Sequence, residues 1–261
     1  MNIRCLIIDR DPIFREKLRK LIKAFRGGNF QVQTVADVTK AIKAIISTDF
    51  SLILCESFLA DRKTGLVASI MGKRPAVSLI ITSQNDSPAL KEFNTISCLK
   101  GFIIRPIRRP ADLAGKVVPA LGSRFYQGNL QSVNCITLIQ IFELEGKDFT
   151  LRVINTINKS EGWLFIKKGI LIDAVCDTMA PLKAAETISL WESVNIDVYN
   201  ICPLTKDRIN LDMTTLILQC EKKLQAGKRL SPKTGIEKSI KSSNTSVNGL
   251  AGLFLKKAKK K

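Results

Sequence analysis

Short apolar runs alternate with helical periodicities along the first 121 residues of the chain. The runs are rich in β-branched residues, and between them apolar side chains recur at intervals of three and four, which is typical of amphipathic helices. Strands are predicted at 3–8, 30–35, 52–55, 77–82 and 101–104. Helices are predicted at about 14–25, 38–46, 66–71, 90–93 and 113–121.

This alternation predicts the fold class of residues 1–121. Strands that are apolar throughout and joined by helical crossovers indicate a parallel sheet with helices on both faces. Asp11 before Pro12 and Asp37 before Val38 have the residue types that begin helices. We therefore expect an α/β domain with a doubly wound, five-stranded parallel sheet, whose functional site lies at the carboxyl ends of the strands.

Polar residues stand at the predicted carboxyl ends of four strands. They are Asp9, Arg10 and Asp11 after the first strand, Glu56 after the third, Thr82 after the fourth and Arg105, before Pro106, after the fifth. This constellation resembles the two-component receiver domain, which has an acidic pair, a phospho-accepting Asp, a Thr or Ser and a Lys-Pro at these places. The resemblance implies a flavodoxin-like fold and a response regulator of a phosphorelay.

Three residues depart from the receiver pattern. Glu56 stands at the phospho-acceptor position, and its extra methylene displaces the carboxylate, while a misplacement of about 1 Å can cost a hundredfold in rate. Arg10 replaces the second member of the acidic pair, where a guanidinium repels Mg²⁺. Arg105 replaces the Lys.

We therefore predict a degenerate pocket, a pseudo-receiver without catalytic residues, metal or other cofactor. In it Arg10 or Arg105 pairs with Glu56, Asp9 or Asp11. Two alternatives stay open. The remaining carboxylates could support a phosphorylatable response regulator that uses Mg²⁺, or the acidic residues could be solvated strand ends, with Asp11 only a helix cap.

A basic edge is expected beside this pocket. In receiver domains the residue at the position of Thr82 couples phosphate to a face made by the fourth helix, the fifth strand and the fifth helix. Here that face would carry Lys100, Arg108 and Arg109 besides Arg105. It is either a docking surface for an acidic signalling protein or a solvated edge.

The middle of the chain has a different pattern. After a linker at 122–128, residues 129–225 show helices at 136–144, 181–191 and 213–224 and strands at 149–154, 163–166, 170–175 and 196–201, which predicts an α+β domain. Its sequence from Trp163 through Gly169 to Ala174 resembles the PATAN domain of bacterial signalling proteins, which implies a protein-interaction module. Asp173 and Asp177 are expected in a solvated turn.

The last segment, 226–261, is expected to be disordered because it is rich in Lys, Ser, Thr, Asn and Gly. An apolar cluster near its end precedes the basic residues Lys256, Lys257, Lys259, Lys260 and Lys261. This basic tail could contact an anionic membrane or nucleic acid, or stay solvated.

Composition narrows the function further. The chain has 261 residues and no histidine, which excludes catalysis by Ser-His-Asp or Cys-His arrangements and histidine-ligated metals. The seven cysteines are odd in number and lie in apolar runs, as reduced core cysteines do. The first apolar run is too short for a signal peptide, so a cytoplasmic location is expected.

The net charge of +18 is unevenly distributed: +11 in residues 1–127, −2 in 128–225 and +9 in 226–261. Anionic partners are therefore expected at the two ends of the chain. Together these features predict a bacterial signalling or adaptor protein that acts through protein–protein contacts with other signalling proteins and is not an enzyme.

Overall fold

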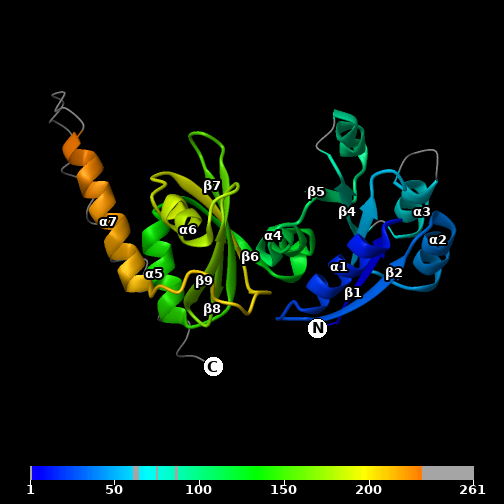
Figure 1. Ribbon diagram of the computed structural model, residues 1–261, viewed down its shortest axis with the longest axis horizontal. Helices are drawn as coiled ribbons and strands as arrows, with labels where there is room; N and C mark the ends of the chain where they lie inside the picture. The colour runs from blue at the N-terminus through cyan, green and yellow to red at the C-terminus, as the bar shows by residue number, and fades with distance from the viewer. Residues whose placement is uncertain (1, 61–64, 75, 86–87, 231–261) are drawn as a thin grey trace. The chain divides into compact units, whose positions relative to one another are not determined.

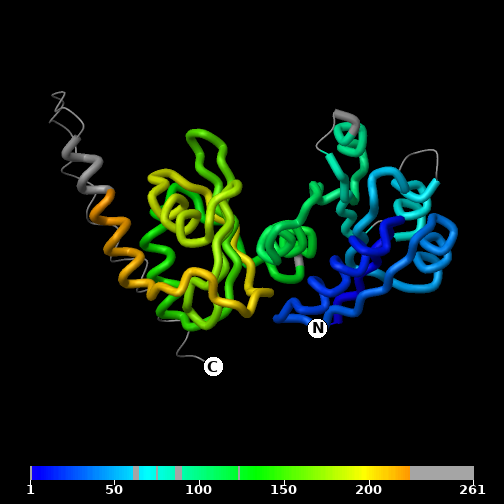
Figure 2. Tube along the Cα trace, in the orientation of Figure 1, coloured from blue at the N-terminus to red at the C-terminus, as the bar shows by residue number. Residues whose placement is uncertain are grey.

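The structure is a computed structural model that describes residues 2–60, 65–74, 76–85 and 88–230 (Figure 1). The chain up to Lys222 packs as one compact unit, and Lys223 onward belongs to a second. The tube in Figure 2 follows the chain from a first sheet, coloured blue to cyan, to a second sheet, coloured green to yellow.

The first sheet has five parallel strands in the order β2-β1-β3-β4-β5. This is the flavodoxin-like strand order, so the predicted doubly wound α/β fold is confirmed. The strands are β1 (Asn2–Ile8), β2 (Asn29–Val35), β3 (Leu52–Glu56), β4 (Ser78–Ser83) and β5 (Leu99–Ile104).

Helices cover both faces of this sheet because successive strand residues point to opposite sides. Ile3 and Ile7 belong to the core formed with α1 (Pro12–Lys23) and α4 (Pro110–Ala120). Leu6 and Ile8 belong to the core formed with α2 (Val38–Ser47) and α3 (Leu66–Lys73). Burial on both sides explains why these strands are apolar throughout.

The helix predicted at 90–93 is not an α-helix. The segment forms a 3-10 helix, η2 (Pro88–Thr95), in which Leu90 is buried and Phe93 is partly buried. Two apolar side chains provide too narrow an apolar face to hold several turns of α-helix against the sheet.

The second sheet is antiparallel, with the order β6-β10-β7-β8-β9, and it packs with helices, which confirms the predicted α+β class. Its elements are β6 (Tyr126–Val133), α5 (Cys135–Glu145), β7 (Phe149–Asn155), β8 (Glu161–Lys167), β9 (Ile170–Val175), α6 (Pro181–Ser189) and β10 (Val194–Tyr199). Lys168 and Gly169 join β8 to β9 in a hairpin turn with φ of 50° and 80°, as a type I′ turn requires.

Two predicted boundaries need correction. Residues 122–128 were expected to be a linker, but they form a short 3-10 turn, η3 (Gly122–Arg124), and the start of β6. The sequence hides β6 because it is an edge strand with exposed residues on both faces. Residues 226–230, expected in the disordered tail, end helix α7 (Met213–Leu230). The rest of the tail, with the five terminal lysines, lies outside the described residues.

Helix α4 is buried on nearly all sides. It packs on β4 and β5 of the first sheet and on β9 of the second. A Cβ atom on Gly115 would lie 3.3 Å from the Trp163 ring, so glycine permits this close approach. A single hydrophobic core therefore runs from the first sheet through α4 to Trp163 and Tyr199.

The seven cysteines are free and buried, as predicted. Burial raises the pKa of the Cys5, Cys135 and Cys202 thiols to about 12, so they are poor nucleophiles. In the part of the chain that the structure describes, no helix is long and apolar enough to span a bilayer.

Candidate functional site

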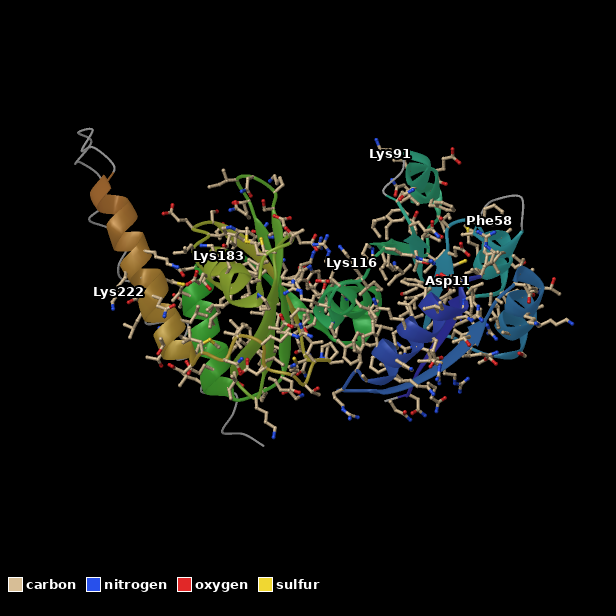
Figure 3. All side chains as sticks on the ribbon, viewed as in Figure 1. Asp11, Phe58, Lys91, Lys116, Lys183 and Lys222 are labelled. Atoms are coloured by element: carbon tan, nitrogen blue, oxygen red, sulfur yellow. The ribbon has the colours of Figure 1, made fainter. Side chains whose placement is uncertain are left out.

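The carboxyl edge of the first sheet brings the predicted pocket residues together. Asp9, Arg10 and Asp11 follow β1, Glu56 ends β3, Thr82 lies in β4, and Arg105 follows β5. Figure 3 labels Asp11 and Phe58, which come from the segments after β1 and β3. Contacts among these side chains form two linked clusters, each built around an arginine.

Arg10 holds Glu56 with three hydrogen bonds. Its Nε donates to Oε2 at 3.1 Å, its Nη2 to Oε1 at 3.0 Å, and its backbone N–H to Oε2 at 3.1 Å. The guanidinium also lies 3.9 Å from the centre of the Phe58 ring. Both oxygens of Glu56 are therefore engaged by Arg10.

Arg105 holds the other two carboxylates. Its Nη2 is in direct contact with Oδ2 of Asp9, and its Nη1 lies 3.7 Å from Oδ2 of Asp11. The guanidinium stacks 3.7 Å from the centre of the Phe14 ring. Since Asp9 is fully buried and the Arg105 side chain is 10% exposed, this pair is shielded from water.

Asp11 and Thr82 complete the arrangement. Asp11 Oδ1 accepts hydrogen bonds from the backbone N–H groups of Ile13 and Phe14, so it caps α1. Its own N–H donates to Asp9 Oδ1 at 2.9 Å, and the Thr82 hydroxyl lies 3.5 Å from Asp9 Oδ2. The sequence predicted that Arg10 or Arg105 pairs with one of these carboxylates; in the structure both arginines do so, and Asp11 is also a helix cap.

The two clusters shift the carboxyl pKa values in opposite directions. Burial alone would raise the pKa of Glu56, but the side-chain and backbone hydrogen bonds from Arg10 outweigh it, so the pKa lies below its usual value. Burial raises the pKa of Asp9, and the Asp11 amide and the Arg105 guanidinium offset this only in part. Asp9 therefore depends on Arg105 to remain charged.

These carboxylates do not fit a magnesium ion. Mg²⁺ needs several oxygen ligands converging on an octahedral site, whereas both oxygens of Glu56 and both of Asp9 already accept hydrogen bonds from the protein. The nearby guanidiniums also supply two positive charges of their own. Within the described ranges, no three His, Cys, Asp or Glu side chains are placed so that they could hold a metal ion together.

The predicted docking face is only partly available. Lys100 and Arg108 are exposed, but Arg109 is not a free surface residue. Its guanidinium donates to the Ala174 carbonyl at 3.3 Å and lies 3.8 Å from Asp173 Oδ1. Helix α4, which would form part of this face, is covered by the second sheet.

Asp173 does not lie where the sequence predicted it. It is buried in β9 rather than solvated in a turn, and it lies between Arg109 and Arg208, whose Nε is 3.7 Å from Oδ2. Burial raises its pKa to about 6, although Arg109 opposes the shift. A lone aspartate inside the apolar run Ile170–Val175 was the available signal, because a carboxylate in a buried strand requires a cation. Asp177, in contrast, is exposed.

Sequence comparisons find no relative: no family model matches the chain, and no curated protein does.

The first half of the chain is similar to solved receiver domains. One is a CheY-like response regulator receiver from Methanospirillum hungatei JF-1, with 23% identity over 46% of this chain and 94% of that one, at a TM-score of 0.41. Another is the receiver domain of a sensor histidine kinase from Pseudomonas aeruginosa PAO1, with magnesium coordinated in its active-site cleft (16% identity, 47% and 100% covered, TM-score 0.40).

A third is the receiver domain of RcsB from Salmonella enterica serovar Typhimurium in the presence of the phosphomimetic BeF3- (21% identity, 45% and 86% covered, TM-score 0.38). All three cover the N-terminal part of the chain, where this protein has its parallel sheet.

Proposed function

We propose that the protein is a bacterial signalling adaptor of the two-component type. Its receiver-like half is held in one state by its own arginines and is not phosphorylated. It acts by contacting other signalling proteins and catalyses no reaction.

The single observation that carries this proposal is the bidentate pairing of Arg10 with Glu56. Glu56 occupies the phospho-acceptor place at the end of β3, and attack on a phosphoryl group would require one of its oxygens to be free. The guanidinium instead binds both oxygens and supplies, inside the chain, the positive charge that a metal would supply.

The second half supports the protein-contact part of the proposal. We infer that it is a PATAN-like interaction module, on the basis of its Trp163–Ala174 sequence and its antiparallel sheet flanked by helices. Its buried carboxylate, Asp173, is paired with arginines rather than with a nucleophile or a general acid, so it has no catalytic partner.

Incubation with Mg²⁺ and acetyl phosphate, followed by intact-mass spectrometry, tests the pseudo-receiver proposal. The wild-type chain is expected to keep its mass. The matched variant restores the receiver residues with Arg10→Asp, Glu56→Asp and Arg105→Lys, and it is expected to gain an acid-stable, hydroxylamine-sensitive adduct. A stoichiometric phosphoryl adduct on the wild-type chain would show that the pocket is functional and overturn the proposal.

A further inference from the structure

An apolar groove lies between α2 and α3 in the first half of the molecule. Its volume is about 420 Å³, within the size range of pockets that bind ligand groups. It is lined by Ile42, Ile45, Ile46, Ala68, Ser69, Gly72 and Lys73. Small residues on α3 face branched ones on α2, so the two helices leave a depression instead of interlocking.

Exposed apolar side chains surround this depression. Ile45 is fully buried and forms the floor, whereas Ile42 is partly buried and Ile46 is 57% exposed. Arg74, which follows α3, donates to the Ile45 carbonyl of α2 at 3.2 Å and lies 3.6 Å from Asp49. The groove therefore leaves apolar surface in water, next to a hydrogen bond that joins the two helices.

The charge at the rim indicates what would fill the groove. Lys73 lines it directly, and Lys43 lies on the exposed side of α2 three residues before Ile46. Neither lysine makes an ion pair among the described residues, while the nearby Asp49 is paired with Arg74. A cationic rim around an apolar floor complements a partner surface in which carboxylates flank an apolar ridge.

The shape narrows the partner further. A concave channel between two helices accepts the ridge of a third helix, whose apolar side chains at i, i+4 and i+7 enter the groove. A flat lipid surface would not reach Ile45, and a second copy of this basic chain would bring like charges together. On one face of the first sheet, α4 is covered by the second sheet. The groove lies on the opposite face, between α2 and α3.

We propose that the α2–α3 groove is the docking site for an acidic amphipathic helix of a partner protein. This inference rests on the proposed adaptor function and names the surface that performs it. It assigns no role to the arginine pocket, so the two can fail separately.

Synthetic peptides test the groove on the full chain. The first probe is a fluorescently labelled helix with leucines at i, i+4 and i+7 and glutamates on its other faces. A second carries lysines in place of the glutamates, and a third has the composition of the first with its leucines spread around the helix. Only the first should bind saturably by fluorescence anisotropy, and its affinity should fall with added salt.

Variants then locate the binding. Ile46→Glu should lower the affinity for the acidic peptide by about tenfold or more, since it places an unpaired charge against the leucines. Lys73→Glu should weaken it by roughly fivefold, as expected for an exposed ion pair. Ile157→Glu is the matched control, because Ile157 is 78% exposed in the turn between β7 and β8, away from α2 and α3 in the chain. It should have no effect, and circular dichroism checks that each variant folds.

Three results would overturn the proposal: equal binding of the acidic and basic peptides, acidic-peptide binding that Ile46→Glu leaves unchanged, or no saturable binding. Sedimentation with phosphatidylcholine–phosphatidylserine vesicles that is lost in Ile46→Glu, without peptide binding, would assign the surface to lipid instead. Binding of the acidic peptide elsewhere would reject the groove but leave the adaptor function standing, whereas a phosphoryl adduct on the wild-type chain would reject the pseudo-receiver whatever the peptides do.

Discussion

Two buried aspartates, one associated with each sheet, are stabilised in different ways. Asp9 lies at the end of β1 and is in direct contact with Arg105, which stacks on Phe14. Asp173 lies within β9, and its two arginines stay 3.7 and 3.8 Å away. Both side chains are almost completely buried, and burial raises both pKa values.

The difference lies in how strongly each carboxylate depends on its cation. Asp9 is contacted by one close guanidinium, a backbone amide and a hydroxyl, so its charge is stabilised by specific hydrogen bonds and an ion pair. Among the described residues, Asp173 accepts a hydrogen bond from the Ala174 amide alone, and its two arginines lie farther away. Loose pairs repay less of the cost of burial, so Asp173 should be the aspartate whose protonation changes first as the pH falls towards 6.

Removing the cation of the tight pair should have the largest effect. Arg105→Ala leaves the Asp9 carboxylate buried without its partner, which is expected to lower the free energy of unfolding by about 3–5 kcal/mol. Urea unfolding at pH 7 measures the loss. The double variant Arg105→Ala/Asp9→Asn should recover part of it, because the uncompensated charge is gone. A loss below 1 kcal/mol, or no recovery, would mean that the pair is not essential to the fold.

The looser pair is tested through pH. Asp173 has a folded pKa of about 6 against 3.8 for the free group, so its stabilising contribution is complete below about pH 4 and is lost as the pH rises through 6. Since one pKa unit corresponds to ~1.4 kcal/mol, this difference between the folded and free pKa values corresponds to about 3 kcal/mol in the free energy of unfolding.

Urea unfolding between pH 4 and 7.5 measures the free energies of unfolding of the wild type and of Asp173→Asn. The difference between the two isolates the contribution of Asp173. The free energy of unfolding of the wild type, relative to that of the variant, should fall as the pH rises, because Asn does not titrate. A difference that instead grows with pH would contradict this prediction, because it would mean that Arg109 and Arg208 hold the folded pKa of Asp173 below its usual value.

The smallest change in stability is expected at the exposed arginine of the first pocket. Arg10 is half exposed, with 51% of its side chain accessible to water. In Arg10→Ala, water therefore replaces much of the lost interaction with Glu56. The pKa of Glu56 should nevertheless rise, since the Arg10 hydrogen bonds that lower it are lost. A carboxyl-detected NMR titration of both proteins measures this, with Arg19→Ala, which pairs with Glu16, as a control. An unchanged Glu56 pKa would contradict the bidentate pairing.

The first sheet and its pocket could be predicted because each signal is local in the chain. The apolar runs set the strands, and parallel strands bring their carboxyl ends to one edge, which places Asp9, Glu56 and Arg105 together without further information. The 3-10 helix at Pro88–Thr95 could not be predicted in the same way, since the choice between helix types depends on how much apolar surface the sheet offers.

The ion pairs around Asp173 could not be predicted because their members meet only through tertiary packing. Arg109, Asp173 and Arg208 are far apart in sequence and belong to different elements. Edge strand β6 was missed for a related reason: with residues of both faces exposed, it lacks the alternation that identifies a half-buried strand.

The burial of α4 has a practical consequence for dividing this protein. The helix has apolar residues on nearly every side, among them Leu113, Ala114 and Val117. A fragment that ended at residue 121, where the receiver resemblance ends, would leave the side that meets Trp163 bare in water. Such a fragment would be prone to self-association, and its behaviour would reflect the cut rather than the intact chain.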